Sequence, residues 1–256
     1  RHEPLGVIAA IVPWNSPLML LTWKLAALLC AGNTVVIKPS EHASASTLAF
    51  VRLFEKAGFP AGVVNTVTGM PDEVGVPLVR HPKVAKIAFT GGEPGGVAIY
   101  KAAAENLKTV TLELGAKSAN IVFANADLES AANGVISGIF AASGQTCIAG
   151  SRLLVERKVH DELVERIVAI AGTAKIGDPS SFDTQVGPVT TRQQREKVLH
   201  YLDVARADGA ECVLGGGIPA DPAIRDGWFV QPSIFTGVNN MMRMGPQEGF
   251  GAGLSI

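Results

Sequence analysis

The sequence has only three cysteines among its 256 residues, Cys30, Cys147 and Cys212. They are too few and too widely spaced for a disulfide scaffold, so we expect a reducing compartment and predict the cytoplasm. We expect Cys30 and Cys212, which have apolar neighbours, to be packing residues. The histidines lack metal-ligand spacing, and no metal site is predicted. The five histidines are His2, His42, His81, His160 and His200.

Long charged runs and long apolar runs are also missing. The formal net charge is -1 and 18% of residues are charged, which gives no electrostatic footprint for nucleic acid or an acidic membrane surface. The apolar stretch from Met19 to Ala31 carries Lys24 and is too short to span a bilayer, so we predict a buried helix there. The expected partner of this globular chain is therefore a small molecule, not a nucleic acid or a membrane.

The chain begins at Arg1 instead of methionine and enters a strand-like segment almost at once. We therefore expect the native N-terminus to be missing, so that a targeting signal cannot be read. The chain shows no Pro-rich or Ser-rich linker and no internal repeat.

Up to about residue 115, short β-rich runs alternate with helical stretches bounded by glycine or proline. This alternation predicts an α/β fold with a Rossmann-like parallel sheet, covered on both faces, and ligands at the carboxyl ends of the strands. The predicted strands are Val7–Val12, Thr34–Ile37, Val63–Thr68, Lys86–Phe89 and Thr109–Leu112. The predicted helices are Met19–Ala31, Ser46–Ala57, Glu73–Arg80 and Gly96–Asn106.

The remainder of the chain predicts a second α/β domain, which places the domains at 1–115 and 116–256. We expect a ligand site in the crevice between the two. Its predicted strands are Asn120–Phe123, Arg152–Val155, Glu211–Leu214, Trp228–Val230 and Ser233–Thr236. Its predicted helices are Leu128–Ala142, Val159–Ala171 and Arg192–Ala207.

Polar side chains follow the first two predicted strands. Asn15 offers an amide donor in a loop stiffened by two prolines, which suits the stabilisation of an oxyanion, although a turn or helix cap would look the same. Lys38 and Glu41 bring opposite charges to the end of a strand, where they can bind ribose hydroxyls. A solvated surface pair remains the alternative.

The loop that contains Gly91, Gly92 and Gly96 follows the fourth predicted strand and leads into a helix. The N-terminus of that helix is a candidate pyrophosphate site. No G-x-G-x-x-G fingerprint is present, so the loop alone is weak evidence.

Two further residues have the chemistry of a catalytic centre. Glu113 ends a strand between apolar neighbours, and partial burial would raise the pKa of its carboxyl and suit it to general-base work. Cys147 stands among small residues that leave a thiol accessible as a nucleophile. Taken alone, Glu113 is equally a solvated carboxylate and Cys147 a small core residue.

Five motifs in order resemble those of the NAD(P)-dependent aldehyde dehydrogenase superfamily. They are Pro13-Trp14-Asn15-Ser16-Pro17, Lys38-Pro39-Ser40-Glu41, Phe89-Thr90-Gly91, Leu112-Glu113-Leu114-Gly115 and Gly144-Gln145-Thr146-Cys147. The resemblance runs the length of the chain, and members of the superfamily extend beyond it at both ends. It implies an internal piece in which an NAD(P)-binding domain precedes a catalytic domain.

The resemblance implies that the protein oxidises an aldehyde to a carboxylic acid. Cys147 would attack the aldehyde to form a thiohemiacetal, and Asn15 with the backbone N–H of Cys147 would hold the oxyanion. Glu113 would activate the water that hydrolyses the thioester and would help to deprotonate Cys147.

The same resemblance implies the cofactor contacts. Lys38 and Glu41 would bind the adenosine ribose, with Trp14 near the cofactor, while Glu248 and Phe250 would contact the nicotinamide ribose and ring. Glu41 favours NAD over NADP, because a carboxylate repels a 2′-phosphate, but NADP remains possible.

The chain departs from the superfamily pattern at several positions. Serine usually follows Gly91, where this chain has Gly92, and a second glycine usually stands at Ala116. Gly249, Ala252 and Gly253 replace larger residues around Phe250, and we expect them to loosen that segment.

Three alternatives stay open at this stage. A CoA-acylating semialdehyde dehydrogenase is similar in sequence, although a base at Glu113 favours water as the acyl acceptor. A cysteine hydrolase would need a histidine beside Cys147, and a truncated piece can be non-catalytic. The resemblance also implies a homo-oligomer, assembled through segments outside this chain.

Overall fold

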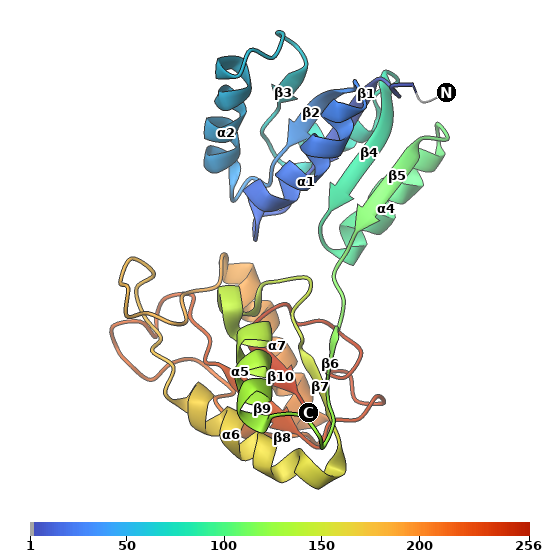
Figure 1. The fold of residues 1–256 in the computed structure, drawn as a ribbon. Helices are drawn as coiled ribbons and strands as arrows, with labels where there is room; N and C mark the ends of the chain where they lie inside the picture. Colours follow the sequence, from blue (N-terminus) through green and yellow to red (C-terminus); the bar gives the residue numbers. More distant parts are fainter. Residues whose placement is uncertain (1–2) are drawn as a thin grey trace. The chain divides into compact units, whose positions relative to one another are not determined.

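The computed structural model describes residues 3–256, so His2 lies outside the described residues. The chain forms two compact units, Arg1–Leu114 and Gly115–Ile256 (Figure 1). Each unit is built on its own five-stranded sheet. The mixed α/β architecture agrees with the fold class predicted from the sequence.

The sheet of the first unit has the strand order β3-β2-β1-β4-β5, and every neighbouring pair is parallel. The sheet therefore has the predicted Rossmann-like parallel arrangement, which brings the carboxyl ends of all five strands to one edge. Its strands are β1 (Val7–Ile11), β2 (Thr34–Lys38), β3 (Val64–Thr66), β4 (Val84–Thr90) and β5 (Thr109–Glu113).

Helices pack against both faces of this sheet (Figure 1). Alternate residues of β1 serve the two faces: Ile8 packs with α1 and α2, while Ala9 belongs to the core formed with α3 and α4. The buried helix predicted around Lys24 is α1. The helical elements are α1 (Pro17–Cys30), α2 (Ser44–Lys56), the π-helix η1 (Pro71–Gly75), α3 (Val76–Arg80) and α4 (Glu93–Ala104).

The second unit has a mixed sheet with the order β6-β7-β10-β9-β8, in which only the β8–β9 pair among the described strands is antiparallel. Its strands are β6 (Ala119–Val122), β7 (Arg152–Val155), β8 (Glu211–Leu214), β9 (Ser233–Thr236) and β10 (Gly253–Ser255). Its helical elements are α5 (Leu128–Phe140), the 3-10 turns η2 (Ala141–Gly144) and η3 (Arg157–Val159), α6 (His160–Gly172) and α7 (Arg192–Ala207).

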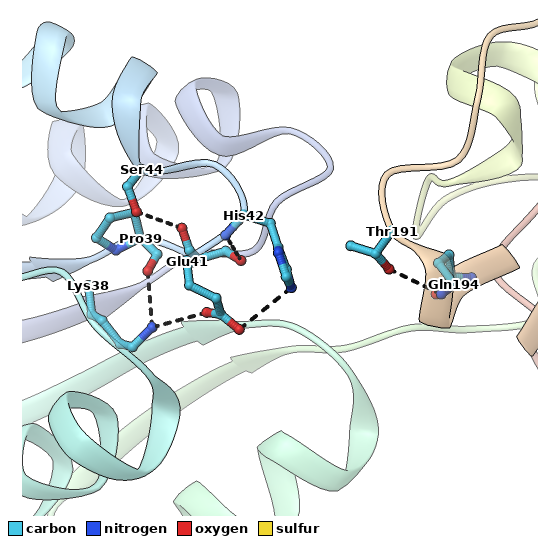
Figure 2. A network of polar contacts seen from close by, with 8 residues as sticks. Lys38, Pro39, Glu41, His42, Ser44, Thr191 and Gln194 are labelled. Atoms are coloured by element: carbon cyan, nitrogen blue, oxygen red, sulfur yellow. Dashed lines mark hydrogen bonds and ion pairs between the residues drawn. The ribbon is translucent and has the colours of Figure 1, made fainter. Parts of the chain in front are cut away.

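Local sequence explains where two of these helices begin. The Asp127 carboxylate accepts a hydrogen bond from the Glu129 N–H at the start of α5 (2.9 Å). The Thr191 hydroxyl accepts one from the Gln194 N–H at the start of α7 (3.1 Å), as Figure 2 shows. Such side-chain caps satisfy backbone donors that have no partner within the helix.

The strand predicted at Trp228–Val230 is wrong, because the structure has a loop there. The Trp228 carbonyl accepts from the Val189 N–H, and Phe229 and Val230 are buried without joining the sheet. A short apolar run carries no periodicity that separates a strand from a buried loop. The sequence analysis also missed β10, whose Leu254 is fully buried between neighbouring strands.

Cys30 is exposed at the C-terminal end of α1, so its predicted packing role is also wrong. The buried face of this helix carries Leu25 and Leu28, and Cys30 lies off that face. The Cys212 side chain is half-buried, with its Sγ 3.3 Å from the Leu214 carbonyl oxygen, and packs against the core of α7.

Candidate active site

The turn that carries Cys147 follows a stretch of unusual backbone. The φ angles of Ala142, Ser143 and Gly144 are 51°, 55° and 74°, so three consecutive residues occupy the left-handed region. Non-glycine residues rarely adopt this conformation, and it ends the helical direction of α5. Such backbone persists only when the surroundings hold it in place.

Hydrogen bonds hold the chain on both sides of Cys147. The Ser143 hydroxyl donates to the Gly187 carbonyl (2.9 Å), and the Gln145 side-chain oxygen accepts from the Thr190 N–H (2.9 Å). Beyond the turn, the Gly150 N–H donates to the Gly138 carbonyl (3.1 Å). Cys147 itself is half-buried, which gives its thiol the access that a nucleophile needs.

The loop before Cys147 lies directly against the C-terminal segment of the unit. A Cβ atom added at Gly144 would stand 2.2 Å from the Gly251 carbonyl carbon, which is closer than atoms can pack. Gly144 is therefore required twice, by its positive φ angle and by this backbone approach.

The segment around Phe250 is more firmly held than its small residues led us to expect. The side-chain amide of Gln194, a buried residue of α7, donates to the carbonyls of Gly249 (3.1 Å) and Phe250 (2.7 Å). These bonds fix Phe250, whose φ angle is also positive (56°). Ala252 is buried and Gly253 begins β10, so the expected loosening is not observed.

Glu248 and Lys117 line one cavity of this unit, together with Thr146 and Phe250. Burial raises the pKa of the Glu248 carboxyl, and the Ala116 N–H at 3.3 Å from Oε1 and the positive charges of Lys197 and Lys117 oppose that rise. Burial lowers the pKa of the Lys117 ammonium to about 8, although Glu248 raises it. Ala116, which replaces a glycine of the superfamily pattern, still donates its N–H.

The first unit has an open cavity of about 400 Å³ at the carboxyl ends of β1, β2 and β4. Predicted site residues from three different loops meet in its wall, namely Trp14, Lys38, Glu41, Gly91 and Gly92. Apolar side chains of α3 and α4 form the other wall, among them Val76, Val79 and Ile99.

Lys38 and Glu41 face this cavity as a loose ion pair (Figure 2). The Lys38 side chain is 5% exposed, and its Nζ donates to the Pro39 carbonyl (3.0 Å) and lies 3.6 Å from Glu41 Oε2. A lysine ammonium has three N–H donors, and 3.6 Å exceeds the usual hydrogen-bond length. The pair therefore keeps donor and acceptor capacity for a ligand.

The glycines of the third loop serve helix packing as much as ligand approach. A Cβ at Gly91 would stand 2.5 Å from the Phe89 ring, and one at Gly96 would stand 2.6 Å from Leu114. Gly92, by contrast, is exposed and has only Pro94 near its added Cβ, at 3.8 Å. Of the predicted glycines, Gly91 and Gly92 line the cavity, whereas Gly96 is buried against Leu114.

Glu113 belongs to a polar network that the sequence analysis missed. The Thr90 hydroxyl donates to Glu113 Oε2 (2.8 Å) and accepts from Lys24 Nζ (2.6 Å), and Lys24 Nζ lies 3.4 Å from the same carboxylate oxygen. Thr90 and Glu113 are register partners on β4 and β5. The signal for Lys24 was its position as a single charge inside an apolar helical run.

Burial lowers the pKa of the Lys24 ammonium, and the nearby Glu113 carboxylate opposes that effect. The partial burial expected for Glu113 is wrong, because its side chain is 43% exposed. Its carboxylate instead contacts the Thr90 hydroxyl and the Lys24 ammonium. Asn15 lies half-buried in the turn between β1 and α1. Asn15 and Glu113 belong to the first unit, and Cys147 belongs to the second.

Two negative findings apply to residues 3–256. No three histidine, cysteine, aspartate or glutamate side chains gather in a way that would hold a metal ion. Within the same residues, every helix is too short or too polar to cross a membrane.

The whole of this sequence, residues 1–256, matches the Aldehyde dehydrogenase family. The chain belongs to this family. The five sequence motifs that resembled aldehyde dehydrogenases therefore identified the family correctly.

Two aldehyde dehydrogenase relatives illustrate the match. Aldehyde dehydrogenase 1A1 of Gallus gallus is 44% identical over 98% of this chain and 49% of its own length. Betaine aldehyde dehydrogenase of Bacillus subtilis is 42% identical over 100% of this chain and 52% of its own length.

Solved aldehyde dehydrogenase structures have the same fold. Betaine aldehyde dehydrogenase from Staphylococcus aureus in complex with NAD+ superposes with a TM-score of 0.96 at 38% identity, covering 99% of this chain and 50% of that one. The NAD+ complex of aldehyde dehydrogenase from Bacillus cereus gives 0.95 at 42% identity, covering 100% and 51%. The chain spans about half the length of the relatives it matches.

Replacing Gly144 with alanine should destabilise the second unit by more than about 2 kcal/mol, since it adds a left-handed alanine to a backbone clash. Urea unfolding measures the change. Gly134→Ala is the matched control, because a Cβ there meets nothing within 4 Å in the interior of α5, and alanine should stabilise that helix. Equal stabilities for the two variants would contradict the packing described here.

Because of Lys117, we expect the free energy of unfolding to change with pH in the alkaline range. Its pKa of about 8 in the folded protein lies below the ordinary value of 10.5, so the unfolded state binds more protons between these values. Stability relative to Lys117→Met should therefore rise from pH 8 to pH 10, by at most ~1.4 kcal/mol per pH unit. A constant difference in the free energy of unfolding between the two proteins from pH 8 to pH 10 would show that the Lys117 ammonium is not desolvated.

Proposed function

We propose that this protein oxidises an aldehyde to the carboxylic acid with NAD+, using Cys147 as the nucleophile. The observation that carries the proposal is the Cys147 turn, accessible and held on both sides, in a chain that matches the aldehyde dehydrogenase family from end to end. The substrate is a small-molecule aldehyde.

The residues around the first-unit cavity fit a dinucleotide. The Lys38 ammonium and the Glu41 carboxylate can exchange hydrogen bonds with ribose hydroxyls, and the apolar wall formed by Val76, Val79 and Ile99 suits a flat base. Trp14 borders the same space, and the exposed Gly92 leaves room for phosphate oxygens near the N-terminus of α4. In the second unit, Glu248 and Phe250 would meet the nicotinamide ribose and ring.

The relatives support NAD+ as the cofactor. The structures from Staphylococcus aureus and Bacillus cereus are NAD+ complexes. In this chain the negative charge of Glu41 at the ribose position disfavours the 2′-phosphate of NADP+. NAD+ is therefore the proposed cofactor, and NADP+ is the weaker alternative.

The reaction begins at the Cys147 sulfur. The thiolate attacks the aldehyde carbon, a C–S bond forms, and the carbonyl oxygen takes up the negative charge. The side-chain amide of Asn15 and the backbone N–H of Cys147 donate hydrogen bonds to this oxygen. Contacts of this kind lower a barrier by about 3 to 4 kcal/mol. When bound, NAD+ supplies the hydride acceptor that turns the adduct into a thioester.

Glu113 then acts as the general base. Its carboxylate takes a proton from water, the hydroxide oxygen bonds to the thioester carbon, and the C–S bond breaks to release the acid and restore the thiolate of Cys147. Thr90 and Lys24 both contact Oε2, so we assign Oε1 as the proton acceptor. The two contacts also keep the carboxylate in one orientation at the end of β5.

We also propose a cellular location and an oligomeric state for the protein. The scarcity of cysteine supports a cytoplasmic location. The membership of the family supports a homo-oligomer in the complete protein. Cell fractionation would test the location, and light scattering of the purified protein would test the oligomeric state.

Cys147→Ala should reduce aldehyde-dependent NADH formation by at least about 10³-fold, because the nucleophile is removed. Glu113→Gln should instead release about one NADH per protein molecule in a burst and then stall at the thioester. Stopped-flow absorbance at the NADH band, over short aliphatic and aromatic aldehydes, distinguishes these outcomes.

The matched control is Cys30→Ala, which makes the same change at an exposed cysteine and should keep full activity. Steady turnover by Cys147→Ala, or an equal loss in Cys30→Ala, would overturn the assignment of the nucleophile.

Gly115→Ala should weaken NAD+ binding with little change in stability. An added Cβ would stand 2.0 Å from Glu248 Oε2, so the flexible carboxylate must leave the Ala116 N–H while the backbone stays in an ordinary conformation. Isothermal titration with NAD+ should show an affinity lower by about tenfold or more, the loss expected for one charge-assisted hydrogen bond. Unchanged affinity would remove Glu248 from the proposed site.

A further inference from the structure

His42 extends the ion pair at the edge of the first-unit cavity. Figure 2 shows the Glu41 carboxylate between the Lys38 ammonium and the His42 imidazole, with Lys38 Nζ 3.6 Å from Oε2 and His42 Nε2 3.8 Å from Oε1. Lys38 and Glu41 belong to the proposed dinucleotide site, whereas the His42 imidazole has no role in it so far. His42 directly follows Glu41, the carboxylate assigned to the proposed adenosine ribose.

The exposure of these groups differs in a way that matters for their charge. The side chain of Lys38 is 5% exposed, that of Glu41 is 28% exposed and that of His42 is 44% exposed. The imidazole is therefore accessible to solvent, whereas the ammonium is buried. The His42 N–H of the backbone donates to the Ser40 hydroxyl (3.3 Å), which fixes the turn that presents the imidazole.

We propose that His42 modulates the cofactor selectivity that Glu41 provides, and that protonation of His42 weakens the preference for NAD+ over NADP+. The proposal rests on the dinucleotide site proposed above. Glu41 rejects the 2′-phosphate through like charge, and an imidazolium beside its Oε1 cancels part of that charge. The imidazolium also competes with ribose hydroxyls for the Glu41 carboxylate.

The charged residues that line the cavity are Lys38, Glu41 and, on η1, Asp72. Carboxyl groups ordinarily change charge below pH 5 and lysine ammonium groups above pH 9. Histidine is the side chain whose ordinary charge change falls between pH 5 and pH 8.

A second titration must be separated from that of His42. The 2′-phosphate of NADP+ has its own second pKa near 6, so the affinity for NADP+ depends on pH even without a histidine. His42→Gln removes the imidazolium but keeps a polar side chain of similar length. The difference between the two proteins then isolates the contribution of the imidazole.

The experiment measures the Kd of NAD+ and of NADP+ for the purified protein and for His42→Gln at pH 6 and pH 8, at one fixed low ionic strength. Quenching of tryptophan fluorescence gives the Kd, since Trp14 lines the cavity. From pH 8 to pH 6, the ratio of the Kd for NADP+ to the Kd for NAD+ should fall about threefold to fivefold more in the native protein than in His42→Gln, as expected for one exposed charge pair.

His160→Gln is the matched control, because His160 also contacts a carboxylate (Asp161, 2.7 Å) but lies on α6 of the second unit. It should behave like the native protein. In a background of Glu41→Gln, the His42→Gln change should alter the ratio by a smaller factor, because the charge that the imidazolium cancels is gone.

The outcomes separate the two proposals. Tight NAD+ binding with identical pH dependence of the ratio in the native protein and His42→Gln would overturn the role of His42 and leave the proposed function intact. If the native protein binds neither NAD+ nor NADP+ at pH 6 or at pH 8, the proposed dinucleotide site is overturned, and the role of His42 with it.

Discussion

Close contact between two stretches of backbone governs the second unit. The loop before Cys147 touches the Gly251 backbone where Gly144 has no side chain, and left-handed residues on both segments allow the approach. Left-handed residues in each segment need support from their surroundings. In the first segment the Ser143 hydroxyl donates to the Gly187 carbonyl, and in the second the Phe250 carbonyl accepts from the Gln194 side chain. The position of the thiol and the position of Glu248 therefore depend on one packed contact.

The first unit relies on charge at the ends of parallel strands. A parallel sheet gathers its carboxyl ends on one edge, so residues far apart in sequence, such as Trp14, Lys38 and Gly92, reach the same cavity. Burial of the Lys38 ammonium is tolerated because a carbonyl and a carboxylate face it. This arrangement holds the pair apart by a distance that leaves both groups able to bind a ligand.

Much of the fold followed from hydrophobic periodicity, and most strands and helices begin within a few residues of the predicted positions. The failures have physical causes. The buried loop at Phe229 has no periodicity to distinguish it from a strand, and β10 depends on tertiary pairing that overrides the poor strand propensity of glycine. The motifs named Cys147, Glu113 and Lys38 as candidate site residues, which stay predictions. Thr90, Lys24 and Gln194 were missed because their partners lie far away in sequence.

The pairing of β4 with β5 gives strand register a functional meaning. Glu113 meets Thr90 and Lys24 because the side chains of successive strand residues point to opposite faces of a sheet. A slip of one residue would turn Glu113 toward α4 and place a leucine above Lys24. β5 is an edge strand, so β4 is its one neighbouring strand in the described sheet. Its register is also set by Val110 and Leu112, which pack in the core on the α4 side. The orientation of the candidate base is therefore maintained by apolar residues packed in the core on the opposite face of the sheet.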